Sequence, residues 1–318
     1  MTAMKMKEDE YLWAQRYRPQ VVADTILPEN TKNIFQRFVD DKNIPNLLLS
    51  GSPGTGKTTA AIAMLDQLDC DYIKINGSLS GGIDTLRVEI SNFASAVSFS
   101  GGRKYVIIDE ADYLTINTQT ALRGFIEDYS KNCGFIFTCN FKNRIIEPLR
   151  GSRFSVVDFA IEKSERPKLA AQFFKRVMSI LKNENIEADP QVVAKIIEKY
   201  FPDFRRVLNE LQKYAAVGTI DEGILSSKKT ESLDEVFSLL KDKKFTEMRK
   251  WVADNSDQDA NELFRKFYDE SLDRIELKSI PGFVIELADY QYKHAFVADP
   301  EINLMAFLTS IMVECSFK

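Results

Sequence analysis

A glycine-rich segment that also carries a lysine and threonines is the part of the sequence best suited to chemistry. It reads Gly-Ser-Pro-Gly-Thr-Gly-Lys-Thr over residues 51–58, between a short apolar run at 46–50 and helix-forming residues at 59–65. Glycines let backbone N–H groups turn toward phosphate oxygens, and the N-terminus of the following helix adds its dipole. This pattern between a strand and a helix therefore predicts that the chain binds a nucleoside triphosphate.

Two side chains of this phosphate loop have tasks of their own. Lys57 would reach the β- and γ-phosphates, and the Thr58 hydroxyl would bind Mg²⁺. The backbone cradle around the phosphates would be formed by Ser52, Pro53, Gly54, Thr55, Gly56 and Thr59. A simple glycine-rich turn is the alternative, and the strand and helix patterns on either side argue against it.

Polar residues follow two further apolar runs. Asp109 and Glu110 come at the end of the run that starts at residue 104, and Asn140 follows the run at 135–139. Asp109 would bind Mg²⁺, mostly through water, while Glu110 would orient and deprotonate the attacking water. Asn140 could hydrogen-bond that water or the γ-phosphate. The alternative, that all three are solvated residues at strand ends, loses weight beside a phosphate loop.

Two arginine clusters lie further along the chain. The first contains Arg150 and Arg153, and the second contains Arg205 and Arg206. Phosphoryl transfer spreads negative charge over the γ-oxygens, and an inserted guanidinium stabilises it. An isolated arginine is more often a surface residue, and spacing from the loop does not distinguish the two cases.

The elements that must position these residues alternate between strands and helices. Apolar runs at 46–50, 71–75, 104–109, 135–139 and 156–159 are separated by segments of helical period. Such alternation predicts an α/β fold, with a parallel sheet covered by helices on both faces. Ligands in such folds bind at the carboxyl ends of the strands, so the loop, the carboxylates and Asn140 should meet in one crevice.

Other parts of the chain show no strand pattern. Residues 11–28 are too aromatic and too interrupted for a helix, and the sequence after about residue 160 is entirely helical in period. The polar stretch at 226–230 has the composition of a linker. We therefore expect three domains, over residues 1–160, 161–228 and 229–318.

Composition excludes several classes of protein. Of the 318 residues, 44% are hydrophobic and 28% charged, which is ordinary for globular domains. No apolar stretch approaches the roughly 20 residues that span a bilayer, and residues 1–10 lack a signal peptide. Four cysteines without C-x-x-C spacing and a single histidine argue against a zinc site. We expect a cytoplasmic protein with reduced thiols and no membrane partner.

The charge is unevenly distributed along the chain. The net charge is −5; residues 231–318 hold 11 basic and 18 acidic residues, a balance of −7, and residues 1–230 hold 31 and 29, a balance of +2. The overall acidity therefore does not exclude nucleic acid as a partner of the first part.

Taken together, these segments resemble the AAA+ ATPases and, within them, the clamp-loader family. The resemblance covers most of the chain. It is carried by Trp-Ala-Gln-Arg-Tyr-Arg-Pro at 13–19, Asp-Glu-Ala-Asp at 109–112, Asn140 as sensor one, Ser152 with Arg153, and Pro-Asp-Phe-Arg-Arg at 202–206 as sensor two. The amino-acid sequences at 92–96 and 201–205 are most similar to those of phage members of the family.

The resemblance implies roles for residues that spacing alone does not select. Arg205 would reach the γ-phosphate of ATP in its own chain, whereas Arg153 would act as an arginine finger on ATP held by a neighbouring subunit. Arg150 competes for that role, because the segment has one extra residue and Phe154 where the family has cysteine. The adenine and ribose would be held by Ala14, Gln15, Arg16, Tyr17 and Ile26.

It also implies an architecture and partners. An ATP-binding domain would be followed by a helical lid and an all-helical collar, and four copies would join one non-ATPase subunit in a five-subunit spiral. This assembly would open a ring-shaped sliding clamp, and primer–template DNA would trigger hydrolysis.

Gln119 would couple DNA contact to the catalytic centre. Candidate DNA contacts are Arg87 and Arg123, and candidate clamp contacts are Phe93, Val97 and Phe99. Solvated surface and core packing are the respective alternatives.

Two other functions fit parts of the sequence. Asp-Glu-Ala-Asp at 109–112 is also the motif of DEAD-box helicases, but the helical residues after 160 leave no second RecA-like lobe. An ATP-gated structural subunit without hydrolysis is opposed by intact Lys57, Asp109 and Glu110.

Phage relatives carry a lysine after Asn-Gly-Ser that restrains the catalytic glutamate, and residues 79–82 contain none. Such a restraint would be absent or would come from elsewhere.

Overall fold

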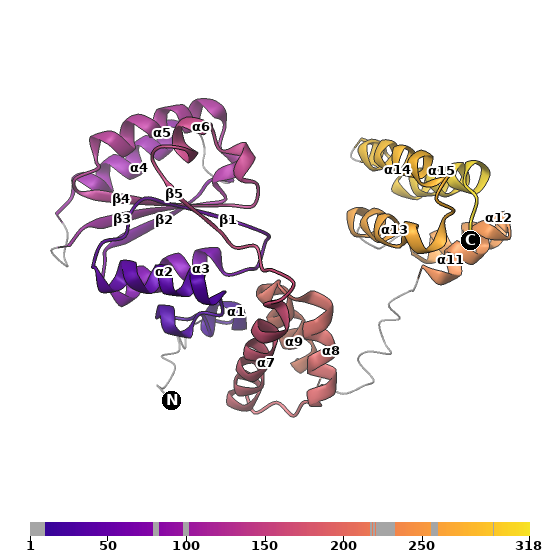
Figure 1. The fold of residues 1–318 in the computed structure, drawn as a ribbon, viewed down its shortest axis with the longest axis horizontal. Coiled ribbons are helices and arrows are strands. Elements are labelled where there is room, and N and C mark those ends of the chain that lie inside the picture. The colour runs from indigo at the N-terminus through magenta and orange to yellow at the C-terminus, as the bar shows by residue number, and fades with distance from the viewer. Residues whose placement is uncertain are drawn as a thin grey trace. The chain divides into compact units, whose positions relative to one another are not determined.

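A computed structural model describes residues 10–78, 83–97, 102–216, 218, 220, 233–255, 260–294 and 296–318, with side chains from 263 onward in the segment that starts at 260. The chain divides into two compact units, Met1–Ile224 (unit 1) and Leu225–Lys318 (unit 2). Figure 1 shows a sheet with helices and a helical bundle in unit 1, and helices alone in unit 2. The three domains expected from the sequence remain a prediction.

Unit 1 is built on a five-stranded sheet with the order β2-β3-β4-β1-β5. The strands are β1 (Leu47–Ser50), β2 (Tyr72–Asn76), β3 (Lys104–Asp109), β4 (Cys133–Cys139) and β5 (Ser155–Asp158). All neighbouring strands are parallel. Every residue of β1 and β4 is buried, because a parallel sheet covered on both faces has no solvent side. The predicted α/β fold is confirmed.

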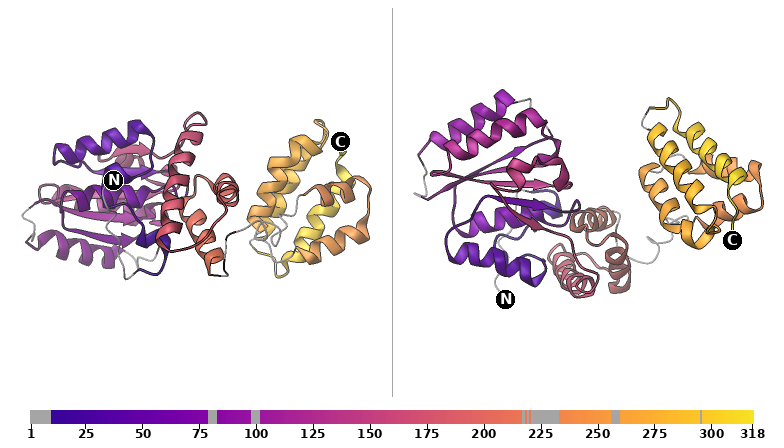
Figure 2. Two further views of the ribbon diagram at one scale, coloured as in Figure 1. Left: turned by 90° about the horizontal axis from the view of Figure 1, so that it is seen from below. Right: turned by 45° about the horizontal axis from the view of Figure 1, so that its top comes forward.

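Helices cover both faces of this sheet (Figures 1 and 2). One face carries α4 (Ile83–Ser95), α5 (Ile116–Asp128) and α6 (Glu147–Arg150), and the other carries α2 (Glu29–Asp40) and α3 (Lys57–Gln67). Each face has a core of its own. Phe135 and Phe137 of β4 contribute to the first core, and Leu47 and Leu49 of β1 contribute to the second.

The N-terminal segment corrects one prediction. Residues Trp13–Arg16 form the short helix α1, and Val22–Asp24 form the 3₁₀ helix η1, although the sequence argued against a helix here. A four-residue helix has little stability of its own. Tertiary contacts supply this stability: Trp13 is buried, and its backbone N–H donates a hydrogen bond to Gln212 Oε1 at 2.9 Å.

The described residues of unit 1 contain three further helices after the sheet: α7 (Arg166–Asn183), α8 (Pro190–Tyr200) and α9 (Phe204–Ala215). Asp203 caps α9 by accepting a hydrogen bond from the Arg206 N–H at 2.9 Å. The backbone N–H of Phe204, the first residue of α9, donates to the Gly54 carbonyl at 3.1 Å. The start of α9 therefore touches the phosphate loop directly.

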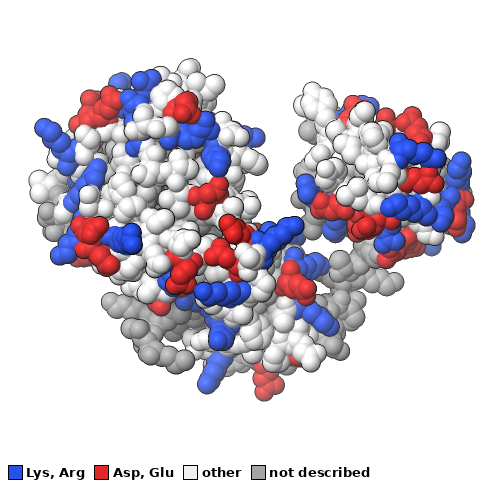
Figure 3. Space-filling model, viewed as in Figure 1, with Lys and Arg blue, Asp and Glu red and all other residues white. Residues whose placement is uncertain are grey.

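Unit 2 contains α11 (Asp234–Lys241), α12 (Phe245–Asp254), α13 (Ala260–Arg274), α14 (Ile280–His294) and α15 (Pro300–Glu314). Its core is aromatic and centres on Phe307, whose ring meets those of Phe264, Phe267, Phe283 and Tyr290. Acidic and basic side chains are intermixed over the visible face of this unit (Figure 3). Among the described helices of the whole chain, none is long and apolar enough to cross a membrane.

Candidate active site

Positive φ angles shape the phosphate loop. Gly54 and Gly56 have φ values of 72° and 93°, in the left-handed region that side chains disfavour. Gly56 immediately precedes α3. At Gly54 space is restricted as well, because a Cβ atom would lie 1.7 Å from Asp203 Oδ1. The loop thus needs glycine both for its own turn and for the close approach of α9.

The loop opens into a cavity of about 470 Å³, a size typical of small-molecule sites. The predicted residues that line it are Ala14, Gln15, Tyr17, Ile26, Pro53, Gly54, Gly56, Lys57, Thr58, Thr59, Asp109, Glu110, Asn140 and Arg205. Ser52 and Thr55 do not line it, and the Thr55 hydroxyl donates to the Ser52 carbonyl at 2.9 Å. The structure therefore brings the phosphate loop, both carboxylates, Asn140 and Arg205 together.

Lys57 is held at the base of the loop. Its Nζ donates to the Gly51 and Ser52 carbonyls at 2.7 and 2.8 Å and to Asn140 Oδ1 at 3.0 Å. Burial lowers the pKa of Lys57, and the nearby carboxylates Asp109 and Asp112 act in the opposite direction. The lysine and Asn140 are therefore neighbours, as expected of two groups that would meet the same γ-phosphate.

Asp109 is surrounded by donors. Its Oδ1 accepts hydrogen bonds from the hydroxyls of Thr138 at 2.5 Å and Thr58 at 2.7 Å, and its Oδ2 lies 3.1 Å from Lys74 Nζ. Burial opposes ionisation of this carboxyl, but these three partners outweigh burial and hold its pKa below the usual value. Asp109 is therefore ionised at neutral pH.

The pair Thr58 and Asp109 fits a magnesium ion that also binds phosphate. Their side chains are in direct contact, and hydroxyl and carboxylate oxygens are the ligands that Mg²⁺ prefers. Within the described residues, no group of three or more His, Cys, Asp or Glu side chains could hold a metal by itself. Phosphate oxygens and water would have to complete the coordination, as they usually do for Mg²⁺ in nucleotide sites.

Glu110 has an unusual backbone for a residue other than glycine. Its φ and ψ are 57° and 43°, a left-handed conformation that costs on the order of 1–3 kcal/mol. Two neighbours hold it there: the Glu110 N–H donates to Thr138 Oγ1 at 3.2 Å, and Gly77 packs so closely that a Cβ would lie 2.7 Å from the Glu110 carbonyl oxygen. No described residue donates a hydrogen bond to the Glu110 carboxylate. Residues 79–82, where the sequence lacks the loop lysine, lie outside the described residues.

Buried polar groups fix the segment after Asn140. Asp112 Oδ2 accepts hydrogen bonds from the N–H groups of Asn140 and Phe141, both at 3.2 Å. Gln119 is 1% exposed; its Nε2 donates to the Leu114 and Arg144 carbonyls at 3.0 Å, and its Oε1 accepts from the Ile146 N–H at 2.9 Å. Gln119 thus joins the start of α5 to the segment that follows Asn140.

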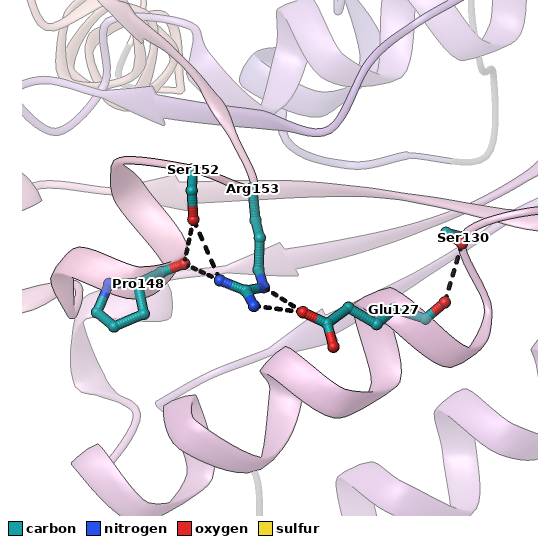
Figure 4. A network of polar contacts seen from close by, with 5 residues as sticks. All are labelled: Glu127, Ser130, Pro148, Ser152 and Arg153. Carbon is teal, nitrogen blue, oxygen red and sulfur yellow. Dashed lines mark hydrogen bonds and ion pairs between the residues drawn. The ribbon is translucent and has the colours of Figure 1, made fainter.

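The arginines fall into two groups. Arg205 lines the cavity, whereas Arg150 and Arg153 lie outside it. Figure 4 shows Arg153 directed at Glu127 of α5 and at the Pro148 carbonyl, to which its Nη1 donates at 2.6 Å.

Arg150 has a separate set of partners. Its Nη2 donates to Glu147 Oε2 at 2.6 Å, and its Nη1 donates to Asn143 Oδ1 at 3.1 Å. Each of the two candidate fingers is therefore held by groups of its own chain, away from its own cavity.

Three cations of the cavity wall were not predicted as site residues: Arg18, Lys74 and Arg176. Burial lowers the pKa of both arginines, and Arg205 adds a repulsive charge beside Arg18. Arg18 belongs to the aromatic segment at 13–19, so its sequence neighbourhood was a usable signal. Lys74 on β2 and Arg176 on α7 lie in no motif, and only the fold brings them to the cavity.

Arg16 lies elsewhere than predicted. It does not line the cavity; its Nη1 donates to Glu184 Oε1 at 2.9 Å. The Tyr17 hydroxyl donates to the same oxygen at 2.6 Å, and burial together with Glu184 raises the pKa of Tyr17. This shared carboxylate attaches the N-terminal segment to the end of α7, so Arg16 orders the wall of the cavity from behind.

Three of the candidate contact residues for DNA and clamp lie on α4 and α5: Arg87, Phe93 and Arg123. Arg87 is exposed, with its guanidinium 5.7 Å from the ring centre of Phe125, and Arg123 is half-buried. Phe93 packs against the core, while Val97 is 89% exposed. Phe99 lies outside the described residues. These roles stay predictions.

The fold and the site define a class of protein. A phosphate loop follows strand β1 of a parallel sheet, Asp109 and Glu110 lie at the end of β3, and Asn140 follows β4. Arg205, from the helical bundle that follows the sheet, also lines the cavity. This arrangement is that of a P-loop nucleoside triphosphatase with an α-helical lid.

Comparison with known proteins narrows the class. Residues 47–162 match the family model "ATPase family associated with various cellular activities (AAA)", and residues 165–226 match "Sliding-clamp-loader large subunit, AAA+ ATPase lid domain". The chain is 35% identical to the sliding-clamp-loader large subunit of Enterobacteria phage T4, over 98% of this chain and 99% of that protein. It is 32% identical to the replication factor C small subunit of Sulfurisphaera tokodaii, over 96% of each chain.

The chain belongs to the clamp-loader family of AAA+ ATPases and is an ATPase subunit of that type. The solved structure of the Thermotoga maritima RuvB Holliday junction branch migration motor is similar in fold, with a TM-score of 0.51 and 17% identity over 70% of this chain and 78% of that one. The helicase alternative finds no support, since the described residues contain one parallel sheet followed only by helices.

Proposed function

We propose that this chain uses ATP binding and DNA-triggered hydrolysis to open a sliding clamp and to load it onto primer–template DNA, as one of several subunits of a loader. Its relatives bear the names of clamp-loader and replication factor C subunits. One observation carries the proposal that assembly is required: the cavity has its own Lys57, Glu110 and Arg205, whereas Arg150 and Arg153 do not line it.

Within one chain, each group has a distinct part. Lys57 and Arg205 bind phosphate oxygens, and Thr58 and Asp109 would hold a magnesium ion, which would neutralise charge on the phosphates. Glu110 accepts the proton of the attacking water, since its carboxylate is not engaged by any described donor. Asn140, fixed by Asp112, orients the water or the γ-phosphate.

Between chains, Arg153 supplies the missing positive charge to ATP in the neighbouring subunit. Glu127 and the Pro148 carbonyl hold its guanidinium in a defined direction, which reduces the conformational entropy lost when it engages phosphate. Unit 2 forms the collar that joins four such subunits to one non-ATPase subunit. We infer that this work takes place in the cytoplasm of an infected cell, because two of the relatives come from phages.

The decisive experiment measures steady-state ATP hydrolysis by the assembled loader, with and without sliding clamp and primed template. We expect clamp and DNA together to raise turnover well above the basal rate, and Glu110→Gln to abolish that increase while ATP still binds. Turnover that responds to neither clamp nor DNA, with all subunits present, would contradict the loader function.

The same assay separates the two candidate fingers. We expect Arg153→Ala to lower DNA-stimulated turnover by a factor of about 10³ or more, as loss of an arginine finger does. ATP binding by the isolated chain should be unchanged, because Arg153 does not line its own cavity. Arg150→Ala is the matched control and should be mild; the reverse ranking assigns the finger to Arg150.

A further inference from the structure

An ion pair between Lys74 and Asp109 lies inside the cavity, and no motif accounts for it. Lys74 belongs to β2, the edge strand of the sheet, and its Nζ lies 3.1 Å from Asp109 Oδ2. The side chains are 41% and 17% exposed, so the pair sits at the cavity wall, partly shielded from solvent. Its position matters because Asp109 is the carboxylate assigned to Mg²⁺.

The two oxygens of Asp109 have different surroundings. Oδ1 already accepts two hydroxyl hydrogen bonds, from Thr58 and Thr138. Oδ2 has Lys74 as its partner in the described part of the chain. A hydrated Mg²⁺ reaches a carboxylate through the hydrogens of its water molecules or through the metal itself, and either approach needs a free lone pair. Lys74 occupies one lone pair of Oδ2, and its positive charge disfavours a metal ion at the other, so the lysine ammonium and hydrated Mg²⁺ compete for the same carboxylate.

Other acidic residues near Lys74 do not serve as its partner. Glu110 lines the same cavity, and Glu10 and Asp66 line a smaller cavity of about 100 Å³ that Lys74 also borders. Among the described residues, the ion pair of Lys74 is with Asp109 alone. Asp66 instead accepts a hydrogen bond from the Tyr72 hydroxyl at 3.1 Å.

We propose that Lys74 is a built-in counter-cation for Asp109, which lowers the dependence of nucleotide binding on Mg²⁺. A triphosphate without metal meets a neutralised Asp109 when Lys74 is present, and a bare carboxylate that repels it when Lys74 is replaced. Bound Mg²⁺ relieves this repulsion by itself, so the lysine matters most for the metal-free nucleotide. The inference rests on the proposed function only in that the cavity binds ATP with Asp109 beside the metal.

The test measures the dissociation constant of a fluorescent N-methylanthraniloyl ATP, once in excess Mg²⁺ and once in EDTA. The ratio of the EDTA value to the Mg²⁺ value should rise about tenfold in Lys74→Met. An opposite charge within about 4–6 Å changes the proton affinity of a carboxylate by roughly 10- to 1,000-fold. We expect an electrostatic effect of similar size on the binding of a triphosphate, at the low end because Lys74 is partly exposed. Lys74→Arg should keep the wild-type ratio. Lys131→Met, at an exposed position before β4, is the matched control.

The outcome that overturns the proposal is a ratio in Lys74→Met that equals that of wild type, or one that rises equally in Lys131→Met. The measurement is repeated in Asp109→Asn, where replacement of Lys74 should have no further effect. A shift that persists there would mean that Lys74 acts on the phosphates directly and would also overturn it. Lys74→Gln repeats the test where the methionine variant does not fold. Because the assay needs neither DNA nor clamp, its result is independent of the loading function.

Discussion

Thr138 is hydrogen-bonded to both Asp109 and Glu110, and its replacement by valine is the most informative single change. Its hydroxyl donates to Asp109 Oδ1 at 2.5 Å and accepts from the Glu110 N–H at 3.2 Å. Thr138 is 1% exposed, and valine has nearly the same shape. Thr138→Val therefore removes two hydrogen bonds with little change in packing volume.

The magnitude follows from the two bonds. A hydrogen bond to a charged group contributes about 1.5–3 kcal/mol, and a buried N–H left unpaired costs on the order of 1 kcal/mol or more. Asp109 is only 17% exposed, so water replaces little of the loss. We expect Thr138→Val to lower the free energy of unfolding of unit 1 by about 3 kcal/mol. DNA-stimulated turnover should fall by about 10- to 100-fold, because a Glu110 without its anchor is misplaced.

Fluorescence offers a clean readout for unit 1. The chain has two tryptophans, Trp13 in unit 1 and Trp251 in unit 2, and both are buried. In a Trp251→Phe background, the emission of Trp13 during urea denaturation reports on unit 1 without the signal of unit 2. The midpoint and slope then yield the free energy of unfolding by linear extrapolation.

Thr118→Val is the matched control for Thr138→Val. Thr118 is also buried, but among the described residues its hydroxyl has the neutral Thr115 hydroxyl as its partner, at 2.9 Å and outside the cavity. This variant should lose about 1 kcal/mol and keep its basal turnover. If Thr138→Val were as stable as Thr118→Val and hydrolysed ATP at the wild-type rate, the Thr138 hydroxyl would not be what positions Asp109 and Glu110.

Two further predictions concern the same strand ends. Gly77→Ala should reduce turnover at least tenfold while ATP binding persists, because its methyl group would lie 2.7 Å from the Glu110 carbonyl oxygen and displace that backbone; equal turnover in a steady-state assay would refute this. The pKa of Asp109 is depressed in the folded protein, so its contribution to stability is complete above the ordinary value of about 3.9 and is lost as pH falls from there through the folded pKa. Urea denaturation between about pH 3 and 5 should therefore show wild type losing stability relative to Asp109→Asn, and parallel pH profiles would contradict the assignment.

The strands and the phosphate loop could be predicted because their signals are local. The strand Leu47–Ser50 begins with three leucines, and Lys104–Asp109 contains four consecutive apolar or aromatic residues; both end at a polar residue. The short helix Trp13–Arg16 was missed because its stability comes from contacts some 200 residues away, with Gln212. Propensity carries no information about such a partner.

The unpredicted parts of the site depend on strand register. Asn76 pairs with Asp109 across β2 and β3, which places Gly77 against Glu110. Ile108 pairs with Phe137 across β3 and β4, which brings Thr138 beside Asp109. In the sequence Thr138 is one polar residue at the end of an apolar strand, and its importance arises only when parallel strands are aligned at one edge.

Three cations, two in the cavity and one at the candidate finger, share one physical property, which is that each is paired with a neighbour within the chain. Lys57 bonds Asn140, Lys74 pairs with Asp109, and Arg153 pairs with Glu127. Removing a charge from water is costly unless it is paired, so these partners make partly buried cations stable in the fold. When phosphate or Mg²⁺ binds, it replaces some of these internal partners. Its affinity therefore reflects the difference in free energy between the interactions that are lost and those that are gained. It follows that replacing the internal partner of a cation should alter ligand binding as strongly as replacing the cation itself.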